Sequence, residues 1–454
     1  MNPYPAYKSS GVPWLGRLPS HWVVEKLKYA VEFVGGGTPS KDEDAYWHGA
    51  IPWVSPKDMK RARIADTEDY ITEAGLAASP CALVPIGSVL AVVRSGILQH
   101  TIPVAVNQVV VTLNQDMKAL VPADGIESRF LAYQIQGCQN ELLDEWVKQG
   151  ATVESVEHQR MADTRLAWPP LREQQDIADY LDTETARIDE LIREKDGLIG
   201  LLREYRQAVI ADHTAGVSRA GSRTSTGNVF CPSVPEGWTM IRLGKYSRIG
   251  NGSTPLKDNA EFWSGGTFPW LNSAVVNQDE VFEGTEYVTA EALRACHLPV
   301  VEAGAVLVAL TGQGKTRGQT TVLRIQATIN QHLAFIALNP ERFDAEYVFW
   351  TLTGMYEALR MVSDGQGGTK GALTCEDLSR FEIPQPPLTD QRDIARQVAQ
   401  ETARIDELIA HTQDEVRLLK ELRAATIAEA VLGRIDVRTA DAADEPATSN
   451  NPSV

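Results

Sequence analysis

One short stretch of the sequence carries residue types that hold phosphate groups in many proteins. Residues 311–318 read TGQGKTRG, with glycines around a Lys-Thr pair as in a P-loop. The P-loop pattern also requires a glycine where this chain has Ala309, and a helix after the Lys-Thr pair. The run that follows, GQTTVLRI, is typical of a β-strand instead. We therefore do not predict a nucleotide site here.

Residue groupings typical of catalysis or metal binding are missing from the sequence. The eight histidines stand singly, without HExxH or HxH spacing, and no GxSxG segment occurs. The sequences WPPL and QPPL lack the Asn or Asp and the aromatic residue of an adenine methyltransferase motif. The five cysteines form no CxxC pair, which argues against zinc or disulfides and favours a reducing compartment. We predict no catalytic residue, no metal site and no cofactor in this chain.

Cations and amides in several segments are candidates for contact with nucleic acid. Lys and Arg neutralise phosphates, whereas Arg, Gln and Thr can hydrogen-bond to base edges. The segment SPKDMKRAR at 55–63 is the most basic part of the first 169 residues, and QGATVESV and DGQGGTKGALT are matching polar loops. A solvated surface run is the alternative for each segment. The candidate DNA-contacting residues are Lys57, Lys60, Arg61, Arg63, Arg94, Gln149, Thr152, Gln313, Lys315, Arg317, Gln319, Gln366, Thr369 and Lys370.

Residues 311–321 have the form of a loop between two β-like runs. The glycines of this loop predict a tight backbone path, with Lys315 and Arg317 exposed on its crest. Arg can bridge O6 and N7 of guanine, and Lys can contact phosphate. We expect this loop to enter a DNA groove. A solvent-exposed hairpin without DNA contact is the alternative.

The elements that must position these residues occur twice. The nine residues ETARIDELI stand at 184–192 and again at 401–409, 217 positions apart. The similarity extends outward, since GGTPSKDEDAYWHGAIPWVS resembles GSTPLKDNAEFWSGGTFPWLN with matched tryptophans, which favours packing over base stacking. In each copy, short β-branched runs alternate with Gly/Pro punctuation and short helical patterns. We predict an α/β (α+β) fold of two similar globular domains, formed by tandem duplication with pseudo-twofold symmetry.

Changes in sequence texture give the expected domain boundaries. A long helical pattern begins after the prolines of each PPL sequence. The expected ranges are 1–169 for the first globular domain, 170–215 for the first long helix, 216–235 for a linker, 236–386 for the second globular domain, 387–432 for the second long helix and 433–454 for an acidic flexible tail.

Each long helix carries apolar residues at heptad spacing, which is typical of a coiled-coil seam. In the first helix, one series contains Leu181 and Ile188, and its companion contains Leu191, Leu198 and Tyr205. A rod of about 40 residues, ~60 Å long, is not stable alone in water, so the two helices are expected to pair antiparallel. The candidate residues for the seam and for a shared partner are Ile177, Leu181, Arg187, Ile188, Leu191, Ile394, Val398, Arg404, Ile405 and Leu408.

Composition limits the location and the surface of the protein. The hydrophobic fraction of 43% and the charged fraction of 23% are typical of a globular chain. No signal peptide or membrane-spanning run is recognisable, so we expect a cytoplasmic protein. The net charge of −17 argues against a broadly basic surface but permits local basic patches.

Together, these segments resemble the DNA-specificity subunit of Type I restriction–modification systems. The resemblance rests on YKSSGVPWLGRLPSHWVVEKLK, on GGTPS with IPWVS, on PLREQQDIADYLDTETARIDELI and its copy, and on AVLGRIDVR. It covers about residues 5–438 and includes order, spacing and duplication.

The resemblance implies that each globular domain is a target recognition domain that reads one part of a bipartite, asymmetric DNA sequence. The paired helices would act as a spacer and dock two methyltransferase (modification) subunits, which two restriction/translocase subunits would join. S-adenosylmethionine, ATP and Mg²⁺ would then be bound by these partners. The alternatives are a self-contained DNA methyltransferase or restriction enzyme, and a coiled-coil scaffold that binds no DNA.

Overall fold

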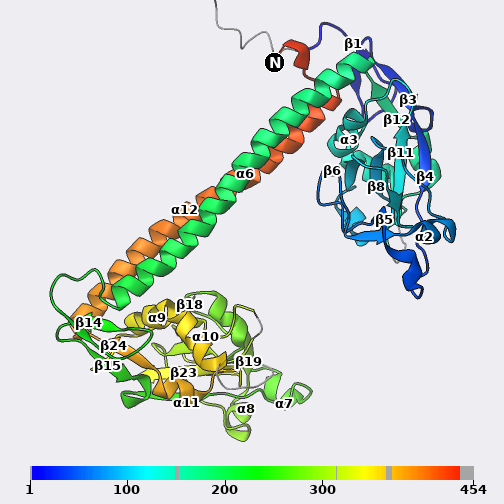
Figure 1. Cartoon of the computed structure of the whole chain (residues 1–454). Coiled ribbons are helices and arrows are strands. Elements are labelled where there is room, and N and C mark those ends of the chain that lie inside the picture. The colour runs from blue at the N-terminus through cyan, green and yellow to red at the C-terminus, as the bar shows by residue number, and fades with distance from the viewer. Residues whose placement is uncertain (1–2, 149–152, 313, 365–370, 440–454) are drawn as a thin grey trace, which may run out of the picture. The chain divides into compact units, whose positions relative to one another are not determined.

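The computed structural model describes residues 3–148, 153–312, 314–364 and 371–439. The chain divides into two compact units. The first unit contains residues 1–195 and 414–454, and the second contains residues 196–413. Each unit contains one globular domain and parts of two long helices (Figure 1).

Two sheets form the globular domain of the first unit. Five strands have the order β4-β11-β8-β9-β6, and three strands have the order β10-β5-β7. The central strand β8, with the sequence VLAV, is buried throughout because both of its faces meet apolar side chains. The strands are β1 (Tyr7–Ser9), β2 (Arg17–Pro19), β3 (Val23–Lys26), β4 (Val31–Gly35), β5 (Trp47–Val54), β6 (Arg63–Ile64), β7 (Asp69–Ile71), β8 (Val89–Val92), β9 (Val104–Asn107), β10 (Thr112–Leu113), β11 (Met117–Pro122) and β12 (Arg165–Trp168).

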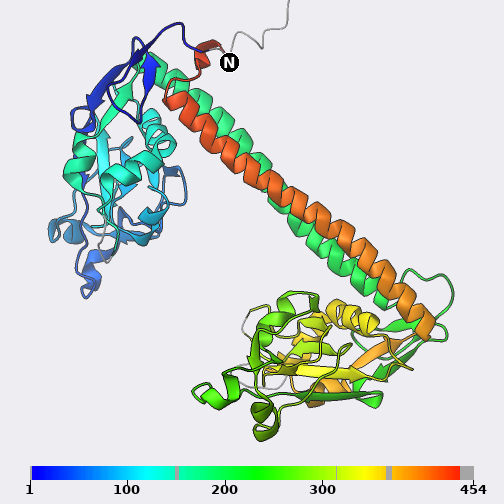
Figure 2. The ribbon, with the colours of Figure 1, turned by 180° about the vertical axis from the view of Figure 1, so that it is seen from behind.

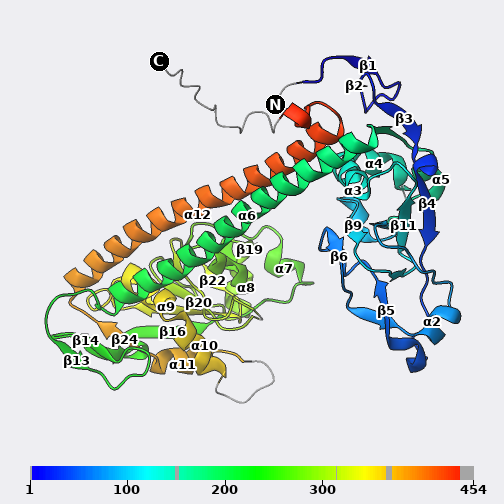
Figure 3. The same ribbon diagram turned by 45° about the horizontal axis from the view of Figure 1, so that its top comes forward.

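Short helices cover the five-stranded sheet of this domain. Helix α3 packs across β9 (Figure 3) and across the neighbouring strand β8. Its Phe130 and Ile135 are fully buried beside Trp22 in the main core. The helices are α1 (Leu27–Ala30), η1 (Asp44–Tyr46), α2 (Glu73–Ala77), η2 (Gly96–Gln99), α3 (Ser128–Gly137), α4 (Gln139–Trp146) and α5 (His158–Asp163).

The second unit repeats this topology strand for strand. Its five-stranded sheet has the order β16-β23-β20-β21-β18, and its three-stranded sheet has the order β19-β17-β22. The strands are β13 (Arg223–Ser225), β14 (Ser233–Pro235), β15 (Thr239–Arg242), β16 (Ser247–Asn251), β17 (Phe268–Leu271), β18 (Glu280–Val281), β19 (Glu286–Val288), β20 (Val306–Ala309), β21 (Thr320–Leu323), β22 (Thr328–Ile329), β23 (Leu333–Leu338) and β24 (Glu382–Gln385). The helices are η3 (Leu243–Lys245), α7 (Ala260–Trp263), η4 (Ser273–Asn277), α8 (Ala290–Ala295), α9 (Ala345–Gly354), α10 (Tyr356–Asp364) and α11 (Cys375–Arg380).

The long helices α6 (Leu171–Thr214) and α12 (Leu388–Val431) lie side by side (Figure 2). In the first unit, Asp189 pairs with Arg423 at 2.8 Å and Lys195 pairs with Glu415 at 2.6 Å. In the second unit, Arg206 pairs with Asp406 at 2.9 Å. The number of the partner on α12 falls as the number on α6 rises, so the helices are antiparallel, as predicted.

The seam between these helices corrects one of the two predicted heptad series. Leu181, Ile188 and Val209 are buried, as expected, but Leu198 and Tyr205 are 41% and 59% exposed. The buried companion series is shifted by one residue in each helix. It contains Thr185, Ile199, Thr402, Val416 and the partly buried Ile192 and Ile409, and it leaves Leu408 55% exposed. A shift of one residue turns a side chain by about 100° around the helix, which moves it out of the seam.

The segments predicted as a linker and as a flexible tail both contain packed residues in the described parts of the chain. Residues 216–235, predicted as a linker, contain the antiparallel pair β13–β14, and Val234 is buried. Residues 433–439, predicted to begin a flexible tail, include the buried Val437, and Gly433 lies against Pro19 and Trp22. The remaining residues of the predicted tail lie outside the described residues. None of the described helices has the length and apolarity needed to cross a lipid bilayer.

Candidate nucleic-acid interface and its supports

The basic segment 55–63 of the first unit forms a turn that leads into β6. Lys57, Lys60 and Arg61 are exposed and line a shallow groove of about 320 Å³ together with Asp66 and Glu68. The structure therefore brings three of the predicted cations to one surface, where they can reach phosphate groups. Acidic side chains share the same groove, so this surface is mixed in charge.

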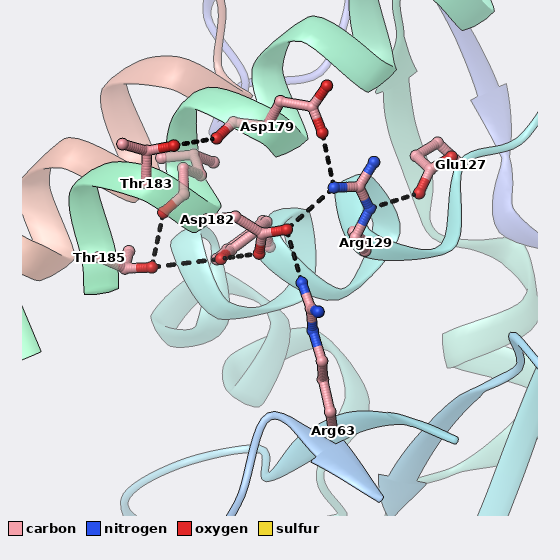
Figure 4. Close-up of polar contacts among 9 residues, drawn as sticks. Arg63, Glu127, Arg129, Asp179, Asp182, Thr183 and Thr185 are labelled. Carbon is pink, nitrogen blue, oxygen red and sulfur yellow. Dashed lines mark hydrogen bonds and ion pairs between the residues drawn. The ribbon is translucent and has the colours of Figure 1, made fainter. Parts of the chain in front are cut away.

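The fourth cation of this segment, Arg63, has a different role. Its guanidinium binds Asp182 of α6 at 2.7 Å. Asp182 also accepts hydrogen bonds from Arg129 at 2.9 Å and from the Tyr133 hydroxyl at 2.8 Å (Figure 4). Burial raises the pKa of Tyr133 to about 12, so the hydroxyl stays a donor near neutral pH. Arg63 thus joins the basic segment to the long helix.

A hairpin loop between β20 and β21 contains Lys315, Arg317 and Gln319, which are three of the candidate residues of the second unit. Lys315 is exposed, as predicted. The expectation that Arg317 lies exposed on the crest is wrong, because it is 6% exposed and its guanidinium pairs with Asp364 of α10. The physical reason is the carboxylate of Asp364, which gives the buried guanidinium a counter-charge. Gln319 is partly buried in the same loop.

Side chains from α10 hold the backbone of this loop. The Tyr356 hydroxyl donates to the Lys315 carbonyl at 2.8 Å, and Arg360 donates to the Gly314 carbonyl. Tyr356, Arg360 and Asp364 follow one another at intervals of four, so they lie on one face of the helix. The loop is therefore fixed at three points by one helix face.

A cavity of about 610 Å³ lies behind this loop within the second unit. It is lined by the loop, by Tyr356 and Arg360 of α10, and by Arg206 of α6. Asp279 also lines it, and its carboxylate lies 3.8 Å from the Arg206 guanidinium. The cavity carries both signs of charge, which does not single out one class of ligand.

The corresponding loop of the first unit lies between β8 and β9 and is held differently. Arg94 forms an isolated backbone bridge with Ser155, and the Ser95 amide donates to the Glu154 carbonyl at 3.1 Å. The Arg94 side chain is exposed. Thr101 donates to Gln139 of α4 at 2.8 Å.

Six of the candidate residues cannot be placed. Gln149, Thr152, Gln313, Gln366, Thr369 and Lys370 lie outside the described residues. Among the helix candidates, Ile177, Leu181, Ile188, Ile394, Val398 and Ile405 are buried, Leu191 is partly buried, and Arg187, Arg404 and Leu408 are exposed. Both arginines lie on the helix surface, where Arg187 pairs with Glu184 of the same helix at 2.8 Å.

The matched tryptophans are part of the framework of each domain. Trp47 and Trp53 meet edge to face at 5.2 Å, and Trp263 and Trp270 do so at 5.3 Å. Each indole N–H donates to a backbone carbonyl; Trp53, for example, binds the Gly37 carbonyl at 3.0 Å. The rings pack against their own domain, as the matched spacing predicted.

Matched glycines serve the same framework. A Cβ atom on Gly36 would lie 1.8 Å from the Asn114 carbonyl oxygen, and one on Gly252 would lie 1.7 Å from that of Ile329. Only glycine permits this approach of two backbone segments. The GGGTP and GNGSTP sequences are therefore required for packing within each domain.

Sequence reasoning missed a buried glutamine at the base of each long helix. Gln174 donates to the Pro169 carbonyl at 2.9 Å and accepts from the Glu127 amide at 2.9 Å. Gln391 makes the same contacts with Pro386 and Asp344. Both are almost fully buried. The signal was available, because the glutamine is identical in both copies although its neighbours differ.

Exposed apolar residues recur at equivalent positions of the two helices. Leu201 and Tyr205 of α6 are 64% and 59% exposed. Leu418 and Leu422, each 217 positions later, are 53% and 49% exposed. Apolar pairs four residues apart form a continuous patch on a helix surface. Each unit thus presents one such patch.

The described residues contain no group of three or more His, Cys, Asp or Glu side chains that could hold a metal ion. What the described surfaces offer is a set of cations on loops, supported by rigid sheets and by one end of a paired helix. Such an arrangement can bind a polyanion, and differences between the loops can distinguish sequences.

Comparison with known proteins gives the class of the chain. A sequence model described as the Type I restriction modification DNA specificity domain matches residues 19–197 and 235–418. These two ranges make up most of the chain, and each contains one globular domain. The protein belongs to this family of DNA-specificity domains.

Individual relatives agree with this assignment. Over 152 residues the chain is 40% identical to the Type I restriction enzyme EcoR124I/EcoR124II specificity subunit of Escherichia coli, a match that spans 33% of this chain and 38% of that subunit. It is 23% identical over 433 residues to the Type I restriction enzyme MjaIX specificity subunit of Methanocaldococcus jannaschii, spanning 93% of this chain and 95% of that one.

A solved structure concerned with complex assembly and conformational transition of the type I R-M system contains a chain of similar fold. The TM-score is 0.72 at 20% identity, over 92% of this chain and 99% of that chain. At this identity the similarity speaks for the fold alone. The predicted fold class, and the prediction of a non-catalytic specificity subunit of a Type I restriction–modification system, are confirmed.

Proposed function

We propose that the two globular domains read the two parts of a bipartite, asymmetric DNA target. The observation that carries this proposal is the repeated frame. The same eight strands occur in the same order in both units, yet the loops between β8 and β9 and between β20 and β21 differ in sequence and in support. Equal frames with unequal loops suit two recognition domains that contact similar backbone and unlike bases.

The contacts to DNA are assigned to the exposed cations. In the first unit these are Lys57, Lys60 and Arg61, and in the second unit Lys315. We include Arg94, whose exposed side chain projects from the first loop. Arg63 and Arg317 act as supports rather than as readers, because each is paired with a carboxylate of its own unit.

Adenine methylation mapping of a host that carries this chain with its modification subunit tests the proposal. We expect a split motif with one methylated adenine in each part. Replacement of residues 20–165 by the first domain of another family member should change one part of the motif and leave the other intact. If both parts changed together, the two domains would not read independently.

We further propose that the helices dock two copies of a methyltransferase subunit, and that these recruit two restriction subunits in the cytoplasm. The matched patches, Leu201 with Tyr205 and Leu418 with Leu422, support two equivalent docking positions. S-adenosylmethionine, ATP and Mg²⁺ would be bound by those partners.

The stoichiometry of the purified complex tests this docking. Leu201→Asp and Leu418→Asp should each reduce the number of bound methyltransferase subunits from two to one, and the double variant should bind none. Leu256→Asp is the matched control, since Leu256 is 74% exposed on the second globular domain. Two subunits bound to the double variant would show that these patches do not dock the partner.

A further inference from the structure

The beginning of each long helix forms a contact surface for the globular domain of its own unit. In the first unit, Asp179 and Asp182 of α6 face Arg63 and Arg129 (Figure 4). Arg129 binds Asp179 at 2.7 Å and is also held by Glu127 at 2.9 Å. Asp182 and Arg129 are 28% and 29% exposed, so solvent screens this network only in part. We call this surface the seat of the first domain.

Equivalent positions in the second unit follow from the shared topology. Strand β6 runs parallel to β9, with Arg63 beside Val106. Strand β18 runs parallel to β21 in the same way, with Glu280 beside Val322. Arg63 is therefore equivalent to Glu280. Helices α3 and α9 have equal length and both end in a glycine that packs on a long helix. Arg129 is therefore equivalent to Glu346. The helix residues Asp179 and Asp182 correspond to Arg396 and Ala399.

The sign of the charge is reversed between the two seats. The first domain presents two cations to an acidic helix. The second domain has Glu280 and Glu346 at the equivalent positions, bridged by its own Arg324. Helix α12 carries Arg396 there, which pairs with Asp393 of the same helix at 3.1 Å. Arg392 of α12 lies 3.8 Å from Asp344 of the second domain. The first pair of surfaces is complementary in charge, and an exchanged domain would place Glu280 and Glu346 beside Asp179 and Asp182.

Each globular domain also makes apolar contacts with the end of the other long helix, and these contacts are alike in the two units. Gly137 meets Ile427 and Val431 of α12, and Gly354 meets Ile210 and Ala211 of α6 in the same way. The buried Thr185 and Thr402 are identical. The charges are the part of the seat that differs in sign between the copies.

We propose that the charges at these seats select which globular domain each helix accepts. Asp179 and Asp182 of α6 stabilise the contact with a domain that has Arg at positions 63 and 129. They destabilise the contact with a domain that has Glu at these positions. Like charges placed opposite each other across an interface lower its stability and suppress wrong pairings. This inference concerns the assembly of the chain and does not depend on which DNA sequence the domains read.

A cycle of charge variants in the full-length chain tests the seat of the first domain. Arg63→Glu with Arg129→Glu should lower the Tm by roughly 3 °C or more, as should Asp179→Arg with Asp182→Ala. The chain with all four substitutions should regain part of the loss, because the cation then carried by α6 faces the two carboxylates of the domain. Asp176→Asn is the control, since Asp176 pairs with Arg172 of its own helix. Losses that simply add would overturn the proposal.

Single neutralising variants cover the case in which a double charge reversal does not fold. Arg129→Gln and Asp182→Asn should each lower the Tm, and their combination should cost less than the sum. Full additivity would again contradict the proposal.

A second measurement uses a chain in which residues 236–386 replace the first globular domain. This chain should be more stable with Asp179→Arg and Asp182→Ala in α6 than with both aspartates retained, because the substitutions remove the like charges from the seat. Equal stability of the two versions would also overturn the proposal.

These experiments need no DNA, so their outcome is separate from that of the proposed function. A chain that fails to read a bipartite target can still show coupled seat charges. A chain that reads the target can equally show none.

Discussion

The loops between β8 and β9 and between β20 and β21 occupy the same place in two domains of the same topology. In the first domain, the loop is held by backbone contacts with residues 154 and 155 and by a hydrogen bond from Thr101 to Gln139 of α4. In the second, side chains of α10 hold the loop, and Arg317 is buried against Asp364. The sheets beneath are alike in strand order. The strand order of the domain is therefore kept while the loop and the contacts that hold it change together, since each different loop needs its own supporting residues.

The largest expected effect falls on the shared frame. Gly36→Ala and Gly252→Ala should each destabilise their own unit by about 3 kcal/mol or more, because the new methyl group would overlap a backbone carbonyl. Chemical denaturation of the full chain, followed by limited proteolysis to identify the unfolded unit, measures the effect. Gly35→Ala is the control, since a methyl group at this neighbouring position would meet open space. Unequal losses of stability at Gly36 and Gly252 would show that the two domain frames are not equivalent.

The next effect concerns the seam that both units share. Ile199→Ala should cost ~2–4 kcal/mol, because Ile199 is 6% exposed between the helices. Leu198→Ala should cost less than about 1 kcal/mol, because Leu198 is 41% exposed. The difference in unfolding free energy between these neighbouring variants checks which residue lies in the seam. The reverse order would restore the original heptad assignment.

A smaller effect distinguishes the two loops. Arg317→Ala should destabilise the second unit by ~1–3 kcal/mol, since the buried guanidinium and its ion pair are lost. Binding to the cognate site and to single-base variants should weaken together. Arg94→Ala, in the corresponding loop of the first unit, should leave the stability within about 0.5 kcal/mol, because its side chain is exposed. Loss of discrimination at one base with unchanged stability would show that Arg317 reads DNA after all.

The smallest effect is that of the exposed lysine. Lys315→Ala should weaken DNA binding about equally for all sequences and reduce the slope of log K against log salt by about 1, as for one phosphate contact. Titrations at two salt concentrations measure it. Lys57→Ala should behave in the same way in the first unit. A variant whose salt slope equals that of the parent would remove that lysine from the interface.

Much of the fold could be predicted because the duplication can be recognised from the sequence. Two long helices, their pairing and the packing of the matched tryptophans follow from repeated patterns, and the resemblance implies the antiparallel direction. The seam was misplaced because Leu198 and Ile199, like Leu408 and Ile409, are adjacent apolar residues. Periodicity alone does not decide which of two adjacent apolar residues faces the partner helix.

The candidate interface was predicted less completely, because its supports come from distant parts of the chain. Arg317 is 47 residues from Asp364, and Arg63 is 119 residues from Asp182. Neither carboxylate can be assigned as a partner from local sequence. Composition identifies cations that could contact DNA, but only the packed structure separates exposed cations such as Lys315 from those held by a carboxylate.

The position of the seat has a consequence for the exchange of genetic material between relatives. Asp179 and Asp182 lie just before the identical stretch ETARIDELI, which begins at residue 184 in one copy and at 401 in the other. A crossover within the codons of that stretch transfers a globular domain together with the helix residues that match its charges. A crossover at the earlier PPL sequence would separate Arg129 from both aspartates. The stretch that is most alike in the two copies is therefore also a boundary at which recombination keeps a domain and its seat together.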